Sequence, residues 1–289
     1  MVELDYLVIG HITRDLVDRD HSVGGTATYA AQTARALGCR VGVITSTGPE
    51  LDLEAALKGV RVTHVPAAAT TTFENTYIDE RRRQVIRGIA RPLLPAMVPK
   101  DWHAPLVHIG PVAQECHPAL GSLFEGAFVG VTPQGWMRQW DASGRVSRCR
   151  WQEAEKVLAR ANAVVLSEED MGGHRPLAAE YAACTGVLAL TRGAAGCIVY
   201  KGREVREFAS PAVVEVDPTG AGDIFAASFF YALQRGHDPW AAARFANCLA
   251  AQSVTRRGIS SVPDIEEVAR CRKVLVEDEV RDADHLRTR

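Results

Sequence analysis

Short apolar runs alternate with amphipathic segments along the second half of the chain. Four runs that are apolar at nearly every position predict buried strands, and the segments between them predict helices. The strands are expected at 106–109, 128–131, 163–166 and 187–190, and the helices at 118–124, 152–160 and 177–184. Strands buried on both faces and separated by helices are typical of a parallel sheet covered on both sides. An α/β fold with a mostly parallel central sheet is therefore predicted.

The two ends of the chain predict elements in a less regular order. In the first 90 residues, strands are expected at 4–9, 41–45, 61–65, 71–78 and 84–89, and helices at about 26–37 and 53–57. After residue 195, strands are expected at 197–200, 204–208 and 212–216, and helices at 220–234, 239–254 and 265–276. Polar turns at 79–82 and 201–203 predict two hairpins. No repeat or linker interrupts the pattern, so one domain spanning 1–289 is expected.

A glycine-rich turn at 216–223 joins the predicted strand 212–216 to an apolar helix. The unpaired N–H groups and the positive dipole end of such a helix favour an anion. Asp223 would repel a bound phosphate, so it is better placed to take a proton from a group that attacks the phosphate. This segment alone is equally compatible with Asp223 capping the first helical turn.

Polar residues follow several of the predicted strands, among them Asp15, Gln134, the run at 167–170 and Thr191. The carboxyl ends of parallel strands meet at one edge of a sheet, where ligands bind in such folds. Turn chemistry explains any one of these residues, but it explains a whole row of them less well. A ligand site at this edge is therefore expected.

The composition restricts the possible partners and the cellular setting. The chain has 47% hydrophobic and 24% charged residues and a net charge of −2, which is typical of a soluble protein and gives no sign of a nucleic-acid partner. No apolar run is long enough to span a membrane, and a signal peptide is not expected before the first strand. The seven cysteines include no CxxC pair, which predicts free thiols in a reducing cytoplasm without a zinc or disulfide framework.

Residues 217–223 (DPTGAGD) resemble the D-T-x-G-A-G-D signature of the ribokinase-like (PfkB) carbohydrate kinases. Other segments resemble further family motifs in the same order, namely 10–15, 24–28, 190–196, 246–247 and 254–258. The resemblance covers nearly the whole chain. It implies a ribokinase-like three-layer sandwich with a small β lid, from about residue 61 to 91. It also implies an ATP-dependent phosphotransferase that acts on an alcohol.

The resemblance also implies a role for each matching residue. Asp223 would be the general base, and the backbone N–H groups of Gly220, Ala221 and Gly222 would form the anion hole for the transferred phosphoryl group. The nucleotide would lie against Thr191, Gly193, Gly196, Thr219 and Asn247. The acceptor would lie against Asp15, Gly24, Gly25, Thr28, Gln134 and Arg138. Arg138 is equally compatible with an ordinary surface position.

Two cations are implied by the same resemblance. The family's N-x-x-E, which organises Mg²⁺ through water, corresponds here to residues 167–170 (SEED), so Asp170 and Glu169 would hold magnesium. Capping of the helix that follows is the alternative role of these acids. A potassium site beside Asp217, Gly258 and Ser261 is compatible with the family pattern.

The chain departs from the family in the region that contacts the acceptor. Thr28 replaces an asparagine that contacts the sugar, so ribose in its usual pose is not expected. Only eight residues separate Asp15 from Gly24, where the family usually places a pair of lid strands. We therefore expect a reduced lid, made mainly of 71–78 and 84–89, and a monomer or a dimer not built by the usual lid clasp.

The predicted acceptor is a sugar or cyclic polyol. Residues 24–26, the Thr-Thr-Phe run at 71–73 and Gln134-Gly135 resemble the family's inositol kinases. One alternative is a nucleoside kinase, which would stack a base on aromatic side chains of the lid. The expected lid strands contain only two aromatic residues, Phe73 and Tyr77. Another is a non-catalytic sugar- or nucleotide-binding regulator, although a binding module has no need of the base Asp223.

Overall fold

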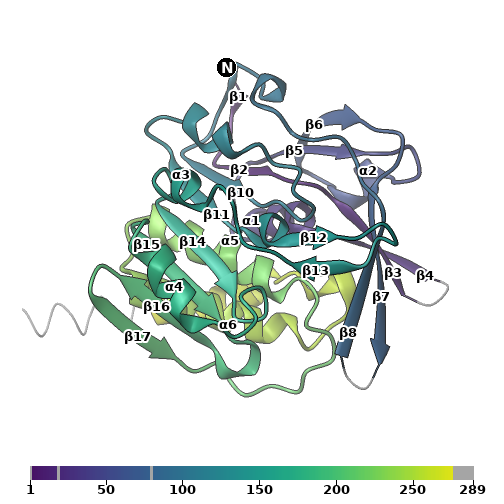
Figure 1. Ribbon diagram of the computed structural model, residues 1–289. Coiled ribbons are helices and arrows are strands. Elements are labelled where there is room, and N and C mark those ends of the chain that lie inside the picture. Colours follow the sequence, from purple (N-terminus) through teal and green to yellow (C-terminus); the bar gives the residue numbers. More distant parts are fainter. Residues whose placement is uncertain (1, 18–19, 79–80, 276–289) are drawn as a thin grey trace, which may run out of the picture.

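The computed structural model describes residues 2–17, 20–78 and 81–275, and its centre is one large sheet (Figure 1). The strand order is β17-β16-β15-β14-β11-β10-β2-β5-β6. These strands are β2 (Tyr6–Ile9), β5 (Val41–Thr47), β6 (Arg61–Pro66), β10 (Leu106–Ile109), β11 (Phe128–Val131), β14 (Ala163–Ser167), β15 (Val187–Thr191), β16 (Cys197–Lys201) and β17 (Glu204–Phe208). At one edge β16 pairs antiparallel with both β15 and β17, and the other neighbouring strands pair parallel. The predicted ribokinase-like α/β fold is confirmed.

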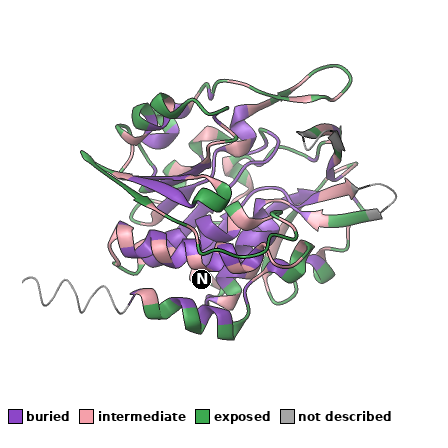
Figure 2. Cartoon of the chain, turned by 90° about the horizontal axis from the view of Figure 1, so that it is seen from below, coloured by how far each residue is buried: buried purple, intermediate pink, exposed green. Residues whose placement is uncertain are grey.

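Two separate apolar cores cover the two faces of this sheet. Successive strand residues point to opposite faces, so Tyr6 and Val8 of β2 join one core while Leu7 and Ile9 join the other. The first core contains α1 (Thr26–Ala36), α5 (Ala221–Gln234), α6 (Pro239–Ser253) and a helix at 265–275. The second contains η2 (Pro118–Leu123), α3 (Ala154–Leu158) and α4 (Arg175–Ala182). Buried positions therefore concentrate between the layers (Figure 2).

A second sheet of four strands, in the order β4-β3-β7-β8, projects from the edge of the body as a lid (Figure 1). It contains β3 (Thr13–Val17), β4 (Asp20–Gly24), β7 (Thr71–Ile78) and β8 (Arg81–Gly88). The expectation that the segment between Asp15 and Gly24 lacks lid strands is wrong. That segment turns back as the β3–β4 hairpin, and β3 gains a parallel partner in β7. The prediction of a monomer or an unusual dimer rested on the missing hairpin and loses that support.

Two further differences concern the boundaries of the lid. The strand β6, which was expected to begin the lid, pairs with β5 at the edge of the main sheet, so the lid hairpin begins at Thr71. A hairpin not expected from the sequence, β12 (Arg138–Trp140) and β13 (Val146–Arg148), lies against the lid through a bridge between Val85 and Arg145.

The strand predicted at 212–216 is absent, because this segment has no strand beside it. Val214 is 82% exposed and the run forms an extended loop before α5. Its β-branched residues favour a strand locally, but a strand also needs a neighbour that supplies hydrogen bonds. The remaining small elements are β1 (Val2–Glu3), β9 (Trp102–His103), α2 (Leu53–Ala56) and the 3₁₀ turns η1 (Pro95–Met97), η3 (Gln134–Met137), η4 (Gly193–Ala195) and η5 (Gly258–Ser261).

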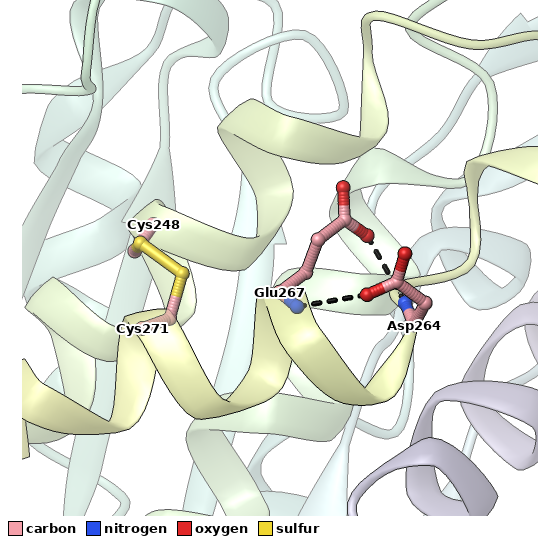
Figure 3. The surroundings of a disulfide bond; sticks show 4 residues. All are labelled: Cys248, Asp264, Glu267 and Cys271. Carbon is pink, nitrogen blue, oxygen red and sulfur yellow. Dashed lines mark hydrogen bonds between the residues drawn. A yellow bond between two sulfur atoms is a disulfide. The ribbon is translucent and has the colours of Figure 1, made fainter.

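A disulfide joins Cys248 of α6 to Cys271 of the helix at 265–275, so the prediction that all cysteines are free is wrong (Figure 3). The two cysteines are 23 residues apart and become neighbours only when the helices pack. The same helix begins with a reciprocal cap, in which the backbone N–H of Asp264 donates to Glu267 and that of Glu267 donates to Asp264. The other five cysteines are free. Among the described residues, no helix is long and apolar enough to cross a membrane.

Candidate active site

The turn before α5 requires glycine at position 220. Gly220 has a φ of 81°, and a Cβ on it would lie 2.4 Å from the ring of Tyr29, which is buried in α1. Both the left-handed backbone and the close approach of Tyr29 therefore exclude a side chain. A Cβ on Gly222 meets nothing within 4 Å. The turn thus places the start of α5 against α1, with open space in front of Gly222.

The first turn of α5 leaves some of the expected backbone amides available to an anion, but not that of Ala221. The first helical hydrogen bond of α5 is donated by the backbone N–H of Ile224 to the carbonyl of Gly220, at 2.9 Å. The N–H of Ala221 donates to the carbonyl of Pro218 at 3.1 Å, so it is already used within the turn. Helix geometry leaves the amides of Gly222 and Asp223 without a partner inside the helix. The geometry therefore favours these two amides over Ala221 as donors to an anion.

Asp223 lies at this helix N-terminus and has a strongly perturbed acidity. Burial raises the pKa of its carboxyl to about 6, and the nearby charges of Asp170 and Asp15 act in the same direction. A hydrogen bond with the hydroxyl of Thr26 and the charge of Arg138 oppose this rise. A carboxylate with a pKa near 6 is ionised at neutral pH but more basic than an ordinary aspartate. This arrangement suits a general base.

Thr26 was not identified from the sequence as a site residue. It is 2% exposed and lies at the first position of α1, directly after the glycine pair, so α1 presents it to Asp223. A Cβ on Gly110 would lie 2.3 Å from its methyl carbon, so that glycine makes room for it. The sequence signal that could have identified Thr26 is its place next to Gly24 and Gly25.

Asp15 lies beside Gly24 of the glycine pair that precedes α1. Asp15 lies on β3, and the Thr13 hydroxyl donates to its carboxylate at 3.3 Å. A Cβ on Gly24 would come within 2.2 Å of Asp15 Oδ2, so glycine leaves room for this carboxylate. The hydroxyl of Thr28 is fully buried and donates to the carbonyl of Gly24 at 2.7 Å. Thr28 therefore supports the turn, and its geometry does not fit the expected contact with the acceptor.

Arg138 contacts the lid and Gln134 contacts the acidic run at 167–170. The Arg138 guanidinium donates to the carbonyl of Val112 at 3.3 Å and lies 5.5 Å from the centroid of the Phe73 ring in the lid. Its charge also lowers the pKa of Asp223, so the guanidinium lies close enough to act on that carboxyl. Gln134 donates to Asp170 at 3.3 Å. The structure thus brings Asp15, Arg138, Asp170 and Asp223 together from four different elements.

The acidic run at 167–170 is closed by hydrogen bonds between its first and last residues. Asp170 accepts hydrogen bonds from the backbone and the hydroxyl of Ser167, at 3.2 and 2.6 Å, and the Asp170 N–H donates back to Ser167. Glu169 is exposed. Among the described residues, no group of three His, Cys, Asp or Glu side chains could hold a metal. Two carboxylates without a closed cage suit Mg²⁺ that keeps its water and binds phosphate oxygens.

The predicted nucleotide residues lie beyond β15. Gly193 and Gly196 have φ values of 55° and 87°, and a Cβ on Gly196 would overlap the carbonyl of Phe208. Thr191 donates to Leu166 O at 3.4 Å. The amide of Asn247 is buried and donates to Phe208 O at 3.3 Å and to Cys197 at 3.4 Å. Its donors therefore tie α6 to the sheet, which leaves only its oxygen for a nucleotide.

Asp217 joins two loops at this side of the site. One carboxylate oxygen accepts from the N–H of Thr219 at 2.9 Å, and the other accepts from Gly258 at 3.1 Å. Burial alone would raise the pKa of Asp217, but these hydrogen bonds and the charge of Arg257 outweigh it and lower the pKa. The first residue of the signature therefore has a structural role, in holding the turn before α5 against η5.

Comparison with known sequences agrees with this geometry. Residues 153–265 match the family of pfkB carbohydrate kinases. A cytidine kinase of Thermococcus kodakarensis is 27% identical over 255 residues, which cover 81% of this chain and 90% of that protein. An inositol 3-kinase of Oryza sativa subsp. japonica is 27% identical over 283 residues, which cover 89% of this chain and 70% of that protein.

Solved structures share the fold at low sequence identity. A pyrophosphate-dependent kinase in the ribokinase family, complexed with a pyrophosphate analog and myo-inositol, has a TM-score of 0.76 and 21% identity. The match covers 89% of this chain and 98% of that one. A ribokinase from Thermotoga maritima has a TM-score of 0.71 and 20% identity, covering 93% of this chain and 99% of that one. These structures support the fold alone.

Proposed function

The chain carries a PfkB carbohydrate kinase domain within a ribokinase-like fold, and from this premise we propose that it phosphorylates an alcohol of a cyclic polyol such as inositol, with ATP as donor. The main support for the proposal is the position and acidity of Asp223. It lies in the first turn of α5, burial raises its pKa to about 6, and the charges of Asp15 and Arg138 act on it. A base beside an anion site, with polar groups opposite, is what transfer of a phosphoryl group to an alcohol needs.

The proposed site has a donor end, which binds the transferred phosphoryl group, and an acceptor end, which binds the alcohol. At the donor end, the amides of Gly222 and Asp223 stabilise the charge of the transferred group, and Gly193 and Gly196 give the loop its shape. At the reacting centre, Thr26 holds the carboxylate of Asp223, which accepts the proton of the attacking hydroxyl. Phosphoryl transfer depends mostly on positioning and on charge stabilisation, so the base need not remove the proton early.

The acceptor end favours a polyol over a nucleoside. Asp15 can accept hydrogen bonds from two neighbouring hydroxyl groups, and the side chains of Gln134 and Arg138 can supply donors. Phe73 is 3% exposed, and one face of its ring lies against the guanidinium of Arg138. A base would have to displace Arg138 to stack there. The inositol kinase relative agrees with a polyol, whereas the cytidine kinase relative keeps a nucleoside as the second candidate.

Two cations fit the donor end. Asp170 and Glu169 would hold Mg²⁺ through water, where the ion would neutralise charge on the phosphates. The hydroxyl of Ser261 is buried without a hydrogen-bond partner and lies in η5, next to the Asp217 loop. An unpaired buried oxygen acceptor is compatible with a monovalent cation such as K⁺ at that place.

The proposal is tested by measuring nucleotide turnover with a panel of acceptors. Purified protein, Mg²⁺ and ATP or pyrophosphate would be combined with inositol isomers, pentoses, hexoses and nucleosides. We expect acceptor-dependent release of ADP with a polyol, and little with nucleosides. Faster turnover with nucleosides would replace the polyol by the second candidate. Absence of turnover with every acceptor and both donors would favour a binding protein.

A further inference from the structure

Glu115 is a buried carboxylate to which the proposed reaction gives no role. It is 3% exposed and lies in the loop between β10 and η2. Its two oxygens accept hydrogen bonds from three backbone N–H groups, those of His11 at 2.9 Å, Val112 at 3.0 Å and Ala113 at 2.7 Å. Backbone amides that converge in this way form an anion-binding nest, which the chain fills with its own carboxylate.

The backbone next to Glu115 is bent to make these contacts. Gln114 is the one residue other than glycine with a positive φ among the described residues, at 60°. Such a backbone costs free energy in a residue with a side chain, and it persists where the surroundings determine it. Here it turns the chain so that the Glu115 side chain returns over residues 112 and 113.

The loop shaped by Glu115 holds Arg138 at two points. The carbonyl of Val112 accepts from the Arg138 guanidinium at 3.3 Å. The side-chain amide of Gln114 donates to the backbone carbonyl of Arg138. Both the side chain and the backbone of Arg138 are therefore bonded to residues 112–114, whose own backbone is held by Glu115.

The same loop also contacts the lid. Val112 and Ala113 pack with Phe73 and Ile86 in an apolar cluster separate from the two main cores. His11 donates its backbone N–H to Glu115 and is fully buried at the base of the lid. Its ring lies 2.7 Å from the hydroxyl of Thr71 and 2.9 Å from the carbonyl of Arg91. A carbonyl only accepts, so the ring nitrogen that faces Arg91 donates this hydrogen bond.

We propose that Glu115 is a positioning residue that couples the lid to Arg138 and thereby sets the affinity for the acceptor. Glu115 touches neither the acceptor end nor Asp223 directly. It acts through the loop at 112–114, which joins the lid on one side and Arg138 on the other. This inference rests on the proposed function, because Arg138 is a contact of the acceptor only in that reaction.

Two variants and one control separate this role from general stability. Glu115→Gln keeps the shape, but its NH₂ group replaces an oxygen that accepts from backbone N–H groups. Gln114→Ala is milder, because Gln114 is exposed and its removal takes away only the bond to the Arg138 carbonyl. Asp238→Asn is the matched control. Asp238 also accepts from two backbone N–H groups, at 2.8 and 3.2 Å, but it caps α6 outside the acceptor end.

The first measurement is amide hydrogen exchange without any substrate. We expect Glu115→Gln to speed exchange in β7 and β8 by about tenfold while β10 and β11 stay unchanged, because the loop at 112–114 holds the lid and not the strands of the main sheet. Asp238→Asn should leave the lid unchanged. Equal exchange in the lid of wild type and of folded Glu115→Gln would overturn the proposal, and so would faster exchange spread evenly over the chain.

The second measurement is steady-state kinetics with the acceptor found by the panel. We expect Glu115→Gln to raise the KM for the acceptor about tenfold and Gln114→Ala to raise it less, with the KM for ATP unchanged. In an Arg138→Met background, Glu115→Gln should change the acceptor KM by less than about twofold. Independent effects of the two substitutions would overturn the coupling. Altered lid exchange without turnover on any acceptor would support the coupling of loop and lid and overturn the proposed function instead.

Discussion

The donor end of the site is built from one continuous segment, whereas the acceptor end is assembled from elements far apart in the sequence. Gly220, Gly222 and Asp223 lie within four residues at the start of α5. Asp15, Phe73 and Arg138 lie on β3, β7 and β12, and a buried loop holds two of these elements together. The donor end therefore depends on local backbone geometry, and the acceptor end depends on how the lid packs.

The substitution with the largest expected effect removes the base that both ends share. Asp223→Asn should lower acceptor-dependent turnover about a thousandfold, because the amide cannot accept the proton of the attacking hydroxyl. Nucleotide affinity, measured by calorimetry, should be kept. Thermal unfolding is the control. Burial disfavours the charge of Asp223, so the variant should be at least as stable as wild type at neutral pH. Retained turnover would remove Asp223 from its role.

The second prediction tests the scaffold of the donor end. Cys248→Ser with Cys271→Ser opens a loop between residues 23 apart and should lower the free energy of unfolding by about 3 kcal/mol. Urea unfolding measures this change. The acceptor KM should stay the same, because the disulfide joins two helices away from the lid. A change in acceptor KM without loss of stability would contradict the separation of the two ends.

The third prediction uses two neighbouring glycines. Gly220→Ala should lower the free energy of unfolding by about 2 kcal/mol, because of its left-handed φ and the overlap with Tyr29. Gly222→Ala has open space and ordinary helical geometry, so it should leave stability unchanged or raise it slightly. Chemical denaturation of both variants makes the comparison. Equal destabilisation would mean that the turn is less constrained than its geometry indicates.

The smallest predicted effect is a shift in pH dependence that links the two ends. Burial raises the pKa of Asp223 to about 6, and its ionised form is the base. The kcat/KM for the acceptor should therefore be level above this pH and fall about tenfold per unit below it. Arg138→Met removes a charge that lowers this pKa, so the fall should begin about half a unit to one unit higher. Arg206→Met, on β17, is the control, since its partners are Glu204 and Trp240. An unchanged profile in Arg138→Met would separate Arg138 from Asp223.

The same contrast explains which parts of the site could be predicted from the sequence. Strands buried on both faces, the glycine turn and Asp223 have local signals, namely apolar runs and a short motif. The lid hairpin β3–β4 has no such signal, because its strands are short and mostly polar, and β3 pairs with β7, more than 50 residues away. Residues 212–216 show the reverse case. Their β-branched residues predict a strand, but the fold places no strand beside them.

Other residues could not be predicted because their roles arise from tertiary contacts. Cys248 and Cys271 pair because two helices pack, and nothing in their spacing indicates it. Glu115 looks like an ordinary loop acid until the fold places the His11 N–H beside it. Thr26 follows a recognised glycine pair, but its contact with Asp223 depends on how α1 packs against α5.

The most direct test of the account is to follow a labelled phosphoryl group. Protein, Mg²⁺, ATP labelled at the γ-position and myo-inositol would be incubated at pH 7.5, and the products separated. We expect a labelled phosphate monoester of the acceptor with wild type and almost none with Asp223→Asn. Label that appears only as inorganic phosphate, at the same rate in both proteins, would contradict it.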